Sequence, residues 1–422
     1  MAPAFEEGMR KTIPRSLVLL ITIGVAMRLV LVATGAAPER FEYDDLARNL
    51  LSGRGYVYDQ LGTAYHSFYA GLAYIVANTA TDWLFPTHPS AMLVTQSLFA
   101  GALGVVVFQI ARRFGSELFA LTAVALVLCH PAFVYYDTHK LHPLGFDSLA
   151  MVAAVWALMR LREDGRPSAA AATGVLMGFA ILQRGSMALF FVASLGWLAV
   201  VLARRRGGWA IAAVYVAGML LVLAPWAARN YAIHGMVMLE SMTPQQVWKG
   251  NATYSNGSGY LPSGRSVYDA APPRLVAEWQ RRDETGQFRL FREESAAEVR
   301  KDPARAAGLV LKKFWYFWTF PPNSGQAYPA RFFGLYLAYY ALMVLTAATG
   351  VAAAFKQSAQ RPDVVLVVIY LASLSIVHAL LFVEMRHRWA AEPLMLVFVP
   401  AGIQAIMARA GWRDANAAGS RS

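Results

Sequence analysis

Long apolar runs dominate the chain and alternate with short charged segments. A helix needs about 18 to 20 consecutive apolar residues to cross a bilayer, and runs of about this length recur along the whole sequence. They lie near residues 16–34, 89–111, 116–136, 143–160, 168–183, 185–203, 209–226, 331–354, 362–383 and 389–408. The pattern predicts an all-α integral membrane protein, a polytopic helical bundle of about ten spans.

The first run, 16–34, also has the length and the small-residue end of a secretory signal peptide. Arg28 inside the run and the many apolar runs downstream favour an uncleaved first helix. A charge within a span is usually paired, so we expect Arg28 to pair with a carboxylate.

Basic residues cluster between the apolar runs, at 112–113, 160–166, 204–206, 356–361 and 409–413. If the N-terminus is cytoplasmic, all five clusters lie on the cytoplasmic side, as the positive-inside rule requires. This agreement holds only if the semi-apolar stretch 66–85 does not cross the membrane. We therefore interpret 66–85 as a re-entrant or interfacial helix.

The same count places four segments on the outer side, namely 35–88, 137–142, 227–330 and 384–388. We expect residues 1–226 to form an N-terminal transmembrane module with a catalytic first outer loop at 35–88. Residues 227–330 would form a small periplasmic domain, and residues 331–422 the C-terminal transmembrane helices and a basic cytoplasmic tail.

Within the predicted periplasmic domain a helical pattern runs from about 274 to 300. A further helix begins with Asp302 as N-cap and Pro303 as first residue, and continues through Phe320.

Composition agrees with a membrane protein and excludes several function classes. Of the 422 residues, 57% are hydrophobic and only 15% are charged, against about 25% charged in soluble domains. The net charge of +12 comes from the basic clusters between spans, so no nucleic-acid partner is expected. Cys129 is the single cysteine, which excludes an internal disulfide. The sequence has no zinc-spaced Cys/His set, P-loop or dinucleotide motif.

A dense carboxylate cluster follows the first apolar run and contains Glu39, Glu42, Asp44 and Asp45. It opens a predicted short helix that ends at Gly53. Carboxylates beside a membrane can serve as general bases. Acids also favour the first turn of any helix because they interact with its dipole, so a non-catalytic role is the alternative.

Four segments, in order along the chain, resemble the GT-C glycosyltransferases of the dolichyl-phosphate-mannose protein mannosyltransferase and aminoarabinose transferase type (glycosyltransferase family 39-like). The first is the Glu-Tyr-Asp-Asp helix with its Gly-x-Gly-aromatic end, at 42–56. The others are the segment 62–69, the Pro-Trp-x-x-Arg-Asn motif at 225–230 with a Gly-Asn turn at 250–251, and the Arg-His-Arg…Pro segment at 386–393.

The resemblance implies a GT-C-type bundle with juxtamembrane helices in the first outer loop. It also implies an inverting glycosyltransferase that moves a monosaccharide from a polyprenyl-phosphate carrier to a glycan, lipid or protein acceptor. The expected location is the bacterial inner (cytoplasmic) membrane, as a multi-pass protein surrounded by membrane lipid and with its active site facing the periplasm.

One departure from the family concerns the base. The family usually presents an Asp upstream of a Tyr in the first loop, whereas the residues upstream of Tyr43 are Glu39 and Glu42, and the aspartates follow it. Glu42 and Asp44 rank level as candidate base, then Asp45, then Glu39.

Arg and Lys side chains can hold a lipid phosphate without a metal. The candidate substrate-binding residues are Tyr43, His142, Asp147, Arg184, Arg229, Lys249, Lys312, Lys313, Arg386 and Arg388. The structural alternative for Lys312 and Lys313 is membrane anchoring, and that for Arg386 and Arg388 is contact with lipid headgroups. No cofactor is expected. A divalent metal at His139 and His142 is less favoured than headgroup or substrate contact.

A transporter or flippase of lipid-linked sugars is the alternative function, since it would need the same basic cavity. Such proteins favour broken helices and paired halves. This sequence has no internal repeat, and its acids gather at one surface of the membrane.

Overall fold

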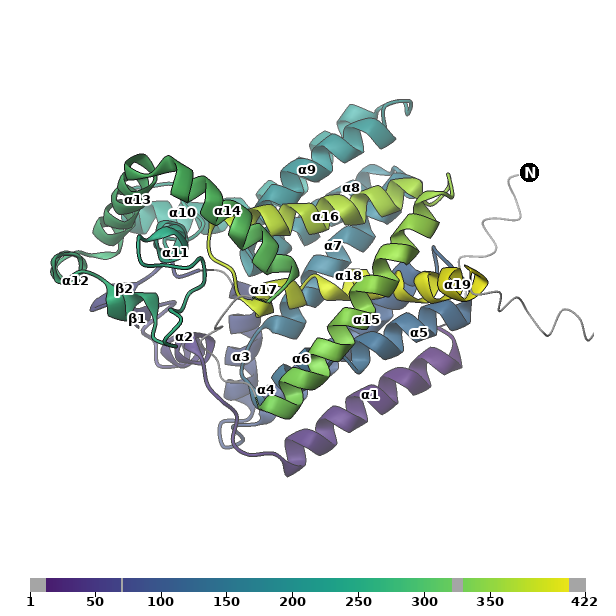
Figure 1. Cartoon of the computed structure of the whole chain (residues 1–422), viewed down its shortest axis with the longest axis horizontal. Coiled ribbons are helices and arrows are strands. Elements are labelled where there is room, and N and C mark those ends of the chain that lie inside the picture. Colours follow the sequence, from purple (N-terminus) through teal and green to yellow (C-terminus); the bar gives the residue numbers. More distant parts are fainter. Residues whose placement is uncertain (1–12, 70, 321–328, 410–422) are drawn as a thin grey trace, which may run out of the picture.

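The computed structural model describes residues 13–69, 71–320 and 329–409, and every structural statement below concerns these residues. Figure 1 shows a bundle of long helices with a smaller, mixed region at one end, drawn on the left. Residues 1–12, residues 321–328 of the predicted periplasmic domain, and the predicted basic tail beyond 409 lie outside the described residues.

Each apolar run becomes a helix or a broken helix. These helices are α1 (Arg15–Thr34), α4 (Ala91–Ala111), α5 (Glu117–Leu128), α6 (Pro131–His139), α7 (Leu144–Asp164), α8 (Pro167–Gln183), α9 (Met187–Val201), α10 (Gly208–His234), α15 (Ala330–Phe355), α16 (Arg361–Leu380), α18 (Glu392–Leu396) and α19 (Val399–Arg409). In the part of the chain that the structure describes, seven helices are long and apolar enough to span a membrane, or eight if the bent pair α5–α6 is one span. The helical membrane fold is confirmed, whereas α8 and α9, with 17 and 15 residues, fall short of the length expected for two of the ten spans.

The stretch 66–85 forms a single short helix, α3 (Leu72–Leu84), of 13 residues. At 1.5 Å per residue it is about 20 Å long, shorter than the roughly 30 Å hydrocarbon core. Its length agrees with the interpretation that this stretch does not cross the membrane.

Helix α10 continues eight residues beyond the end predicted at 226, and Pro225 lies inside it. Tertiary contacts stabilise the extension. The Asn230 amide donates to the carbonyl oxygens of Met238 and Leu239, at 3.1 Å each. The helix ends at Gly235, whose φ of +66° favours glycine. The Pro-Trp-x-x-Arg-Asn motif therefore lies on the last turns of a helix.

The region between α10 and α15 contains α11 (Thr243–Asn251), the 3₁₀ helix η2 (Val267–Ala270), α12 (Pro273–Gln280), α13 (Glu284–Lys301) and α14 (Pro303–Trp318). The helical pattern predicted over about 274–300 is confirmed. It is two helices, because the Asp283 side chain accepts a hydrogen bond from Gly286 N–H at 2.7 Å and starts α13. Asp302 caps α14 as predicted, by accepting from Arg305 N–H at 2.9 Å. The aromatic rings of Trp248, Trp279 and Phe291 form the centre of this region.

The first loop folds into α2 (Glu42–Leu51) and a hairpin of β1 (Tyr58–Gln60) and β2 (Thr63–Tyr65). The predicted acidic helix is confirmed, and Gly53 follows it with φ +80°. Near the other end of the chain, α17 (Met385–Trp389) forms a short turn between α16 and α18.

Three of the basic clusters, at 112–113, 160–166 and 204–206, meet at one end of the bundle. Arg113 forms an ion pair with Glu163 and another with Asp363, 2.8 Å from Nε. Arg205 donates to the carbonyl oxygens of Glu163 and Asp164 at the end of α7, at 3.3 and 3.2 Å. The first loop and the α11–α13 region lie at the opposite end (Figure 1). This arrangement is the two-sided distribution of loops that the charge pattern predicts.

Arg28 pairs with a carboxylate, as expected. Its Nε lies 3.0 Å from Asp137 Oδ2, and both side chains are buried. Its Nη1 also donates to the carbonyl oxygen of Leu128 at 2.8 Å. The arginine thereby joins α1 to the bend between α5 and α6.

Candidate active site

A cavity of about 870 Å³ opens where the first loop, the α8–α9 turn, α11 and α17 meet. This volume is typical of small-molecule sites, which measure roughly 300–1,000 Å³. The predicted site residues that line it are Glu42, Tyr43, His142, Asp147, Arg184, Lys249 and Arg386. Segments distant in the sequence thus meet at one candidate active site.

Glu42 is the first residue of α2 and the acid-cluster member that lines this cavity. Its Oε1 accepts a hydrogen bond from the Tyr69 hydroxyl. Burial raises the pKa of the Glu42 carboxyl above its ordinary value, while its own backbone N–H and the charges of Arg386 and Lys249 oppose the rise. A carboxylate with a raised pKa is a better proton acceptor than an exposed glutamate.

Two cations of the cavity lining, Arg386 and Lys249, come from different elements, and their charges lower the pKa of Glu42. Arg386 of α17 pairs with Glu384, its Nη2 lying 2.9 Å from Oε2. Lys249 of α11 lies over the Phe382 ring, with Nζ 4.6 Å from the ring centroid. Burial lowers the pKa of Lys249, and the charges of Glu384 and Glu42 oppose this effect.

The Gly-Asn turn of α11 packs against the segment between α16 and α17. This contact connects the segments that carry Lys249 and Arg386. A Cβ on Gly250 would lie 1.9 Å from the carbonyl oxygen of Leu381, so glycine permits this close approach. Lys313 donates to the carbonyl oxygens of Leu380 and Leu381, at 3.2 and 2.8 Å, and to Asn251 Oδ1 at 2.9 Å. Lys313 is therefore placed to satisfy the C-terminal carbonyl groups of α16, away from the cavity lining.

A second polar group lines the cavity at the break between α8 and α9. Arg184 Nη1 lies 3.1 Å from Asp147 Oδ2, and the Gln183 amide donates to Asp147 Oδ1 at 2.6 Å. His142 Nδ1 accepts from Leu144 N–H at 3.2 Å, which requires an unprotonated Nδ1. Burial and the nearby positive charges lower the pKa of His142, in agreement with a neutral ring.

The remaining acids of the cluster lie outside the cavity lining. Asp44 is 2% exposed, and its Oδ2 lies 2.9 Å from Arg48 Nη2 and 3.3 Å from Arg40 Nη1. Asp45 is half exposed and pairs with Arg48 at 2.7 Å. Glu39 pairs with Lys140 at 2.7 Å, alongside a backbone bridge between the same two residues.

Arg388 also lies outside the cavity lining, in a buried network. Its Nε lies 2.9 Å from Glu392 Oε1, and its Nη2 donates to the Tyr336 hydroxyl at 2.6 Å. His130 Nε2 is 2.6 Å from the other Glu392 oxygen. These contacts fix α17 and α18 against α15 and the α5–α6 bend, so they favour a structural role for Arg388.

Lys312 and Arg229 do not line the cavity either. Lys312 is exposed, with Nζ 5.5 Å from the Tyr316 ring centroid, as expected of a membrane anchor. Arg229 stacks on Trp226 at 4.6 Å and donates to the carbonyl oxygen of His66 at 2.8 Å.

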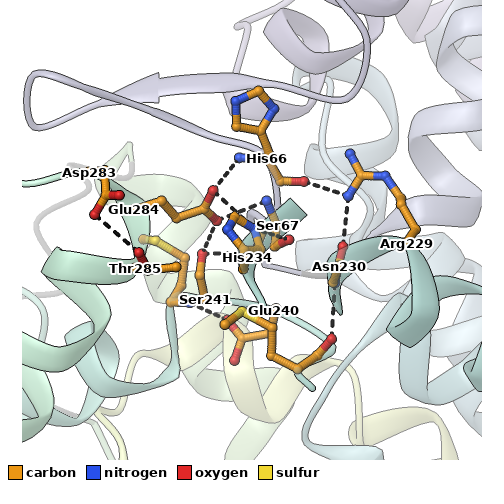
Figure 2. Close-up of polar contacts among 12 residues, drawn as sticks. His66, Ser67, Arg229, Asn230, His234, Glu240, Ser241, Asp283, Glu284 and Thr285 are labelled. Atoms are coloured by element: carbon orange, nitrogen blue, oxygen red, sulfur yellow. Dashed lines mark hydrogen bonds and ion pairs between the residues drawn. The ribbon is translucent and has the colours of Figure 1, made fainter. Parts of the chain in front are cut away.

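Glu284 was not among the predicted site residues, yet it fixes the loop that carries Tyr69. Its carboxylate accepts from His66 N–H at 2.6 Å, Ser67 N–H at 2.9 Å and the Ser241 hydroxyl at 2.5 Å. Figure 2 shows Glu284 at the centre of this cluster, next to Ser67 and His234. The Ser67 hydroxyl lies 2.9 Å from His234 Nε2. The sequence offers only a weak signal, an acid in the first turn of a capped helix.

Tyr69 and His387 were also missed, although both belong to segments that carry the family resemblance. Both line the cavity. Within the described ranges, no group of three or more His, Cys, Asp or Glu side chains is arranged to hold a metal ion. The cofactor expectation and the roles of the site residues remain predictions.

Residues 72–228 match the family model for dolichyl-phosphate-mannose-protein mannosyltransferase. Among curated proteins, none matches this sequence. The solved structures that it resembles include the apo oligosaccharyltransferase of Archaeoglobus fulgidus, with a TM-score of 0.56, 14% identity, and coverage of 96% of this chain and 52% of that one.

A second structure of that enzyme, AglB in complex with an inhibitory peptide and a dolichol-phosphate, gives a TM-score of 0.57, 13% identity, and coverage of 97% and 52%. ArnT from Cupriavidus metallidurans bound to undecaprenyl phosphate gives a TM-score of 0.44, 15% identity, and coverage of 93% and 78%. The chain thus spans about half the length of AglB.

The AglB likeness shows a shared fold, and the family model matches a segment that runs from α3 into α10. Together they confirm the resemblance to the GT-C glycosyltransferases that the sequence motifs indicate, and with it the GT-C-type membrane fold.

Proposed function

We propose that this chain is an inverting glycosyltransferase that moves a monosaccharide from a polyprenyl-phosphate carrier to an acceptor. The main support is that Glu42 lines the same cavity as Arg184, Lys249 and Arg386. The mannosyltransferase family model and the AglB fold support the reaction class, and AglB itself was solved with a dolichol-phosphate.

In this mechanism Glu42 accepts the proton of the acceptor hydroxyl as that oxygen attacks the anomeric carbon. The bond between the anomeric carbon and the phosphate oxygen breaks on the opposite face, and the phosphate leaves with the electron pair. Arg386 and Lys249 would stabilise the departing phosphate, since charge-assisted hydrogen bonds to phosphate are strong. Attack from the face opposite the leaving group inverts the anomeric centre.

The apolar part of the lining supplies a path for the prenyl chain. Leu189 of α9 and Val377 of α16 line the same cavity as the charged residues. These side chains would contact the first prenyl units while the phosphate stays with the cations. Surrounding membrane lipid would exchange with the carrier along this apolar side.

We also propose the orientation and the division of the chain. Residues 1–226 and 331–422 would form the transmembrane parts, and residues 227–330 an extracytoplasmic domain. The end with the cavity would face the periplasm across a bacterial inner membrane, because the basic clusters at the other end fit a cytoplasmic side.

A transporter of lipid-linked sugars is the second candidate, favoured by the helix breaks at α5–α6 and α8–α9. The placement of Glu42, Lys249 and Arg386 at one end of the bundle favours the transferase.

An assay with the purified protein in detergent distinguishes the two functions. The protein is incubated with a radiolabelled polyprenyl-phosphate hexose and a cell-envelope extract. The transferase releases polyprenyl phosphate and labels an acceptor without any vesicle. A transporter leaves the donor intact, and that result would overturn the proposal.

A further inference from the structure

Five aromatic side chains of the cavity lining neither bind the phosphate nor accept the proton in the proposed transfer step. They are here called the aromatic wall: Tyr56, Tyr58, Phe68, Tyr69 and Trp226. They come from the first loop and from α10. The cations of the cavity come from other elements, the α8–α9 turn, α11 and α17.

The aromatic wall consists of two groups of contacting rings, joined by one hydrogen bond, and one of the groups ends at the candidate base. The ring centroids of Tyr58 and Phe68 are 4.4 Å apart, and those of Phe68 and Tyr69 are 4.3 Å apart. Tyr56 contacts Trp226 at 5.1 Å and donates to the carbonyl oxygen of Tyr69 at 3.4 Å. Because the Tyr69 hydroxyl donates to Glu42, a molecule lying along the wall is directed toward that carboxylate.

Arg229 holds Trp226 in place. Its guanidinium lies 4.6 Å from the Trp226 ring centroid and does not line the cavity, while the indole N–H donates to the carbonyl oxygen of Leu239 at 2.9 Å. The indole is thereby fixed before any ligand binds, which lowers the entropy lost on binding.

Polar side chains border the aromatic wall. Glu240 lines the cavity and accepts from Met242 N–H at 2.6 Å and from the Thr243 hydroxyl. Gln60 also lines it, and its buried Oε1 has no hydrogen-bond partner within the described ranges. Figure 2 shows Glu240 near Ser241, beside the cluster around Glu284. Both side chains offer oxygen acceptors, so they suit a ligand rich in hydroxyl groups.

We propose that the aromatic wall binds the acceptor and that the acceptor is a neutral saccharide with one hydroxyl against Glu42. This inference rests on the proposed function and adds the class of its acceptor. A pyranose ring has apolar C–H faces, which pack on aromatic rings, and a rim of hydroxyls, which hydrogen-bond to Gln60 and Glu240. An anionic acceptor would be repelled by Glu240.

The test uses the purified full chain in detergent and saturation-transfer NMR with a mixture of methyl pyranosides and cellobiose. A second sample contains a Ser/Thr-rich peptide. Trp226→Leu and Tyr58→Leu remove parts of the wall. Trp83→Leu is the matched control, because Trp83 is 71% exposed and does not line the cavity.

We expect a saturation-transfer signal from the saccharide C–H protons with the wild-type protein and with W83L. With W226L and Y58L we expect this signal to be at least about fivefold weaker. A fivefold loss of affinity corresponds to roughly 1 kcal/mol, within the range for one aromatic contact. Two wall variants are used so that the inference stays testable if W226L fails to fold.

Three results would overturn the inference. They are saturation of the peptide in place of the saccharides, no saturation of any saccharide, and equal saccharide signals in all variants. Binding of polyprenyl monophosphate to the same samples tests the proposed function separately. If polyprenyl monophosphate does not bind but the saccharide signal still depends on the wall, the proposed donor is contradicted. The inference that the aromatic wall binds a saccharide then still stands.

Discussion

The hydroxyl of Tyr69 donates a hydrogen bond to Oε1 of Glu42, and this contact links the first-loop helix to the segment that follows the hairpin. The backbone just before Tyr69 is held by Glu284, through the N–H groups of His66 and Ser67. The orientation of the candidate base therefore depends on the α11–α13 region as well as on its own helix.

Replacing Tyr69 with Phe removes the hydrogen bond to Glu42. Hydrogen bonds to charged groups contribute about 1.5–3 kcal/mol, so we expect kcat to fall by roughly ten- to a hundredfold. Transfer kinetics with a polyprenyl-phosphate hexose check this. Tyr231→Phe is the control, since Tyr231 is 56% exposed on α10. Equal kcat values for the two variants would show that Tyr69 does not orient the base.

The pH dependence of transfer reports the protonation of Glu42. A protonated carboxyl cannot accept the acceptor's proton, so activity is lost as the pH falls through the Glu42 pKa. Burial raises that pKa, and the acidic limb therefore lies above the value of about 4.3 for an exposed glutamate. Lys249→Met removes a charge that opposes the rise and should move the limb further upward. A limb at or below pH 4 contradicts this assignment.

Lys313 makes stability depend on pH. Burial lowers its pKa to about 7, well below that of a lysine in the unfolded chain. Between pH 7 and about 10 the unfolded chain binds more protons at this residue, so stability rises with pH by at most about 1.4 kcal/mol per unit. The thermal midpoint should rise from pH 7 to pH 9 in the wild type. Lys313→Met should flatten this rise, whereas Lys312→Met, at an exposed position, should keep it.

The Arg28–Asp137 pair is expected to support the first helix. Removing one partner leaves an uncompensated buried charge, which costs about 3–5 kcal/mol. Arg28→Met and Asp137→Leu should each lower the thermal midpoint strongly. The double variant should recover much of the loss, because no lone charge remains. A double variant that loses as much as the sum of the single variants would argue against direct coupling.

The sequence was sufficient to predict the helical membrane fold and which segments meet. The runs of apolar residues and the basic clusters placed 35–88, 137–142, 227–330 and 384–388 at one end, and the cavity lining draws on all four. Charge and hydropathy decide such large-scale features, because the cost of burying a charge in lipid is high.

The choice between neighbouring candidates could not be made from the sequence. Glu42 and Asp44 are two residues apart on a helix and so point about 200° apart, which places only one of them on a given face. The same holds for Arg386 and Arg388 on α17, where the first lines the cavity and the second pairs with Glu392. Which face is used depends on how α2 and α17 pack, and periodicity alone does not contain that information.

Single-turnover transfer by E42Q, compared with D45N, tests whether Glu42 is the general base. We expect E42Q to bind polyprenyl monophosphate like the wild type and to transfer sugar about 100- to 10,000-fold more slowly, as follows from the loss of a general base. D45N, altered at an exposed residue outside the cavity lining, should stay close to the wild-type rate. Full transfer by E42Q, or an equal loss in D45N, would contradict the assignment of Glu42 as the general base.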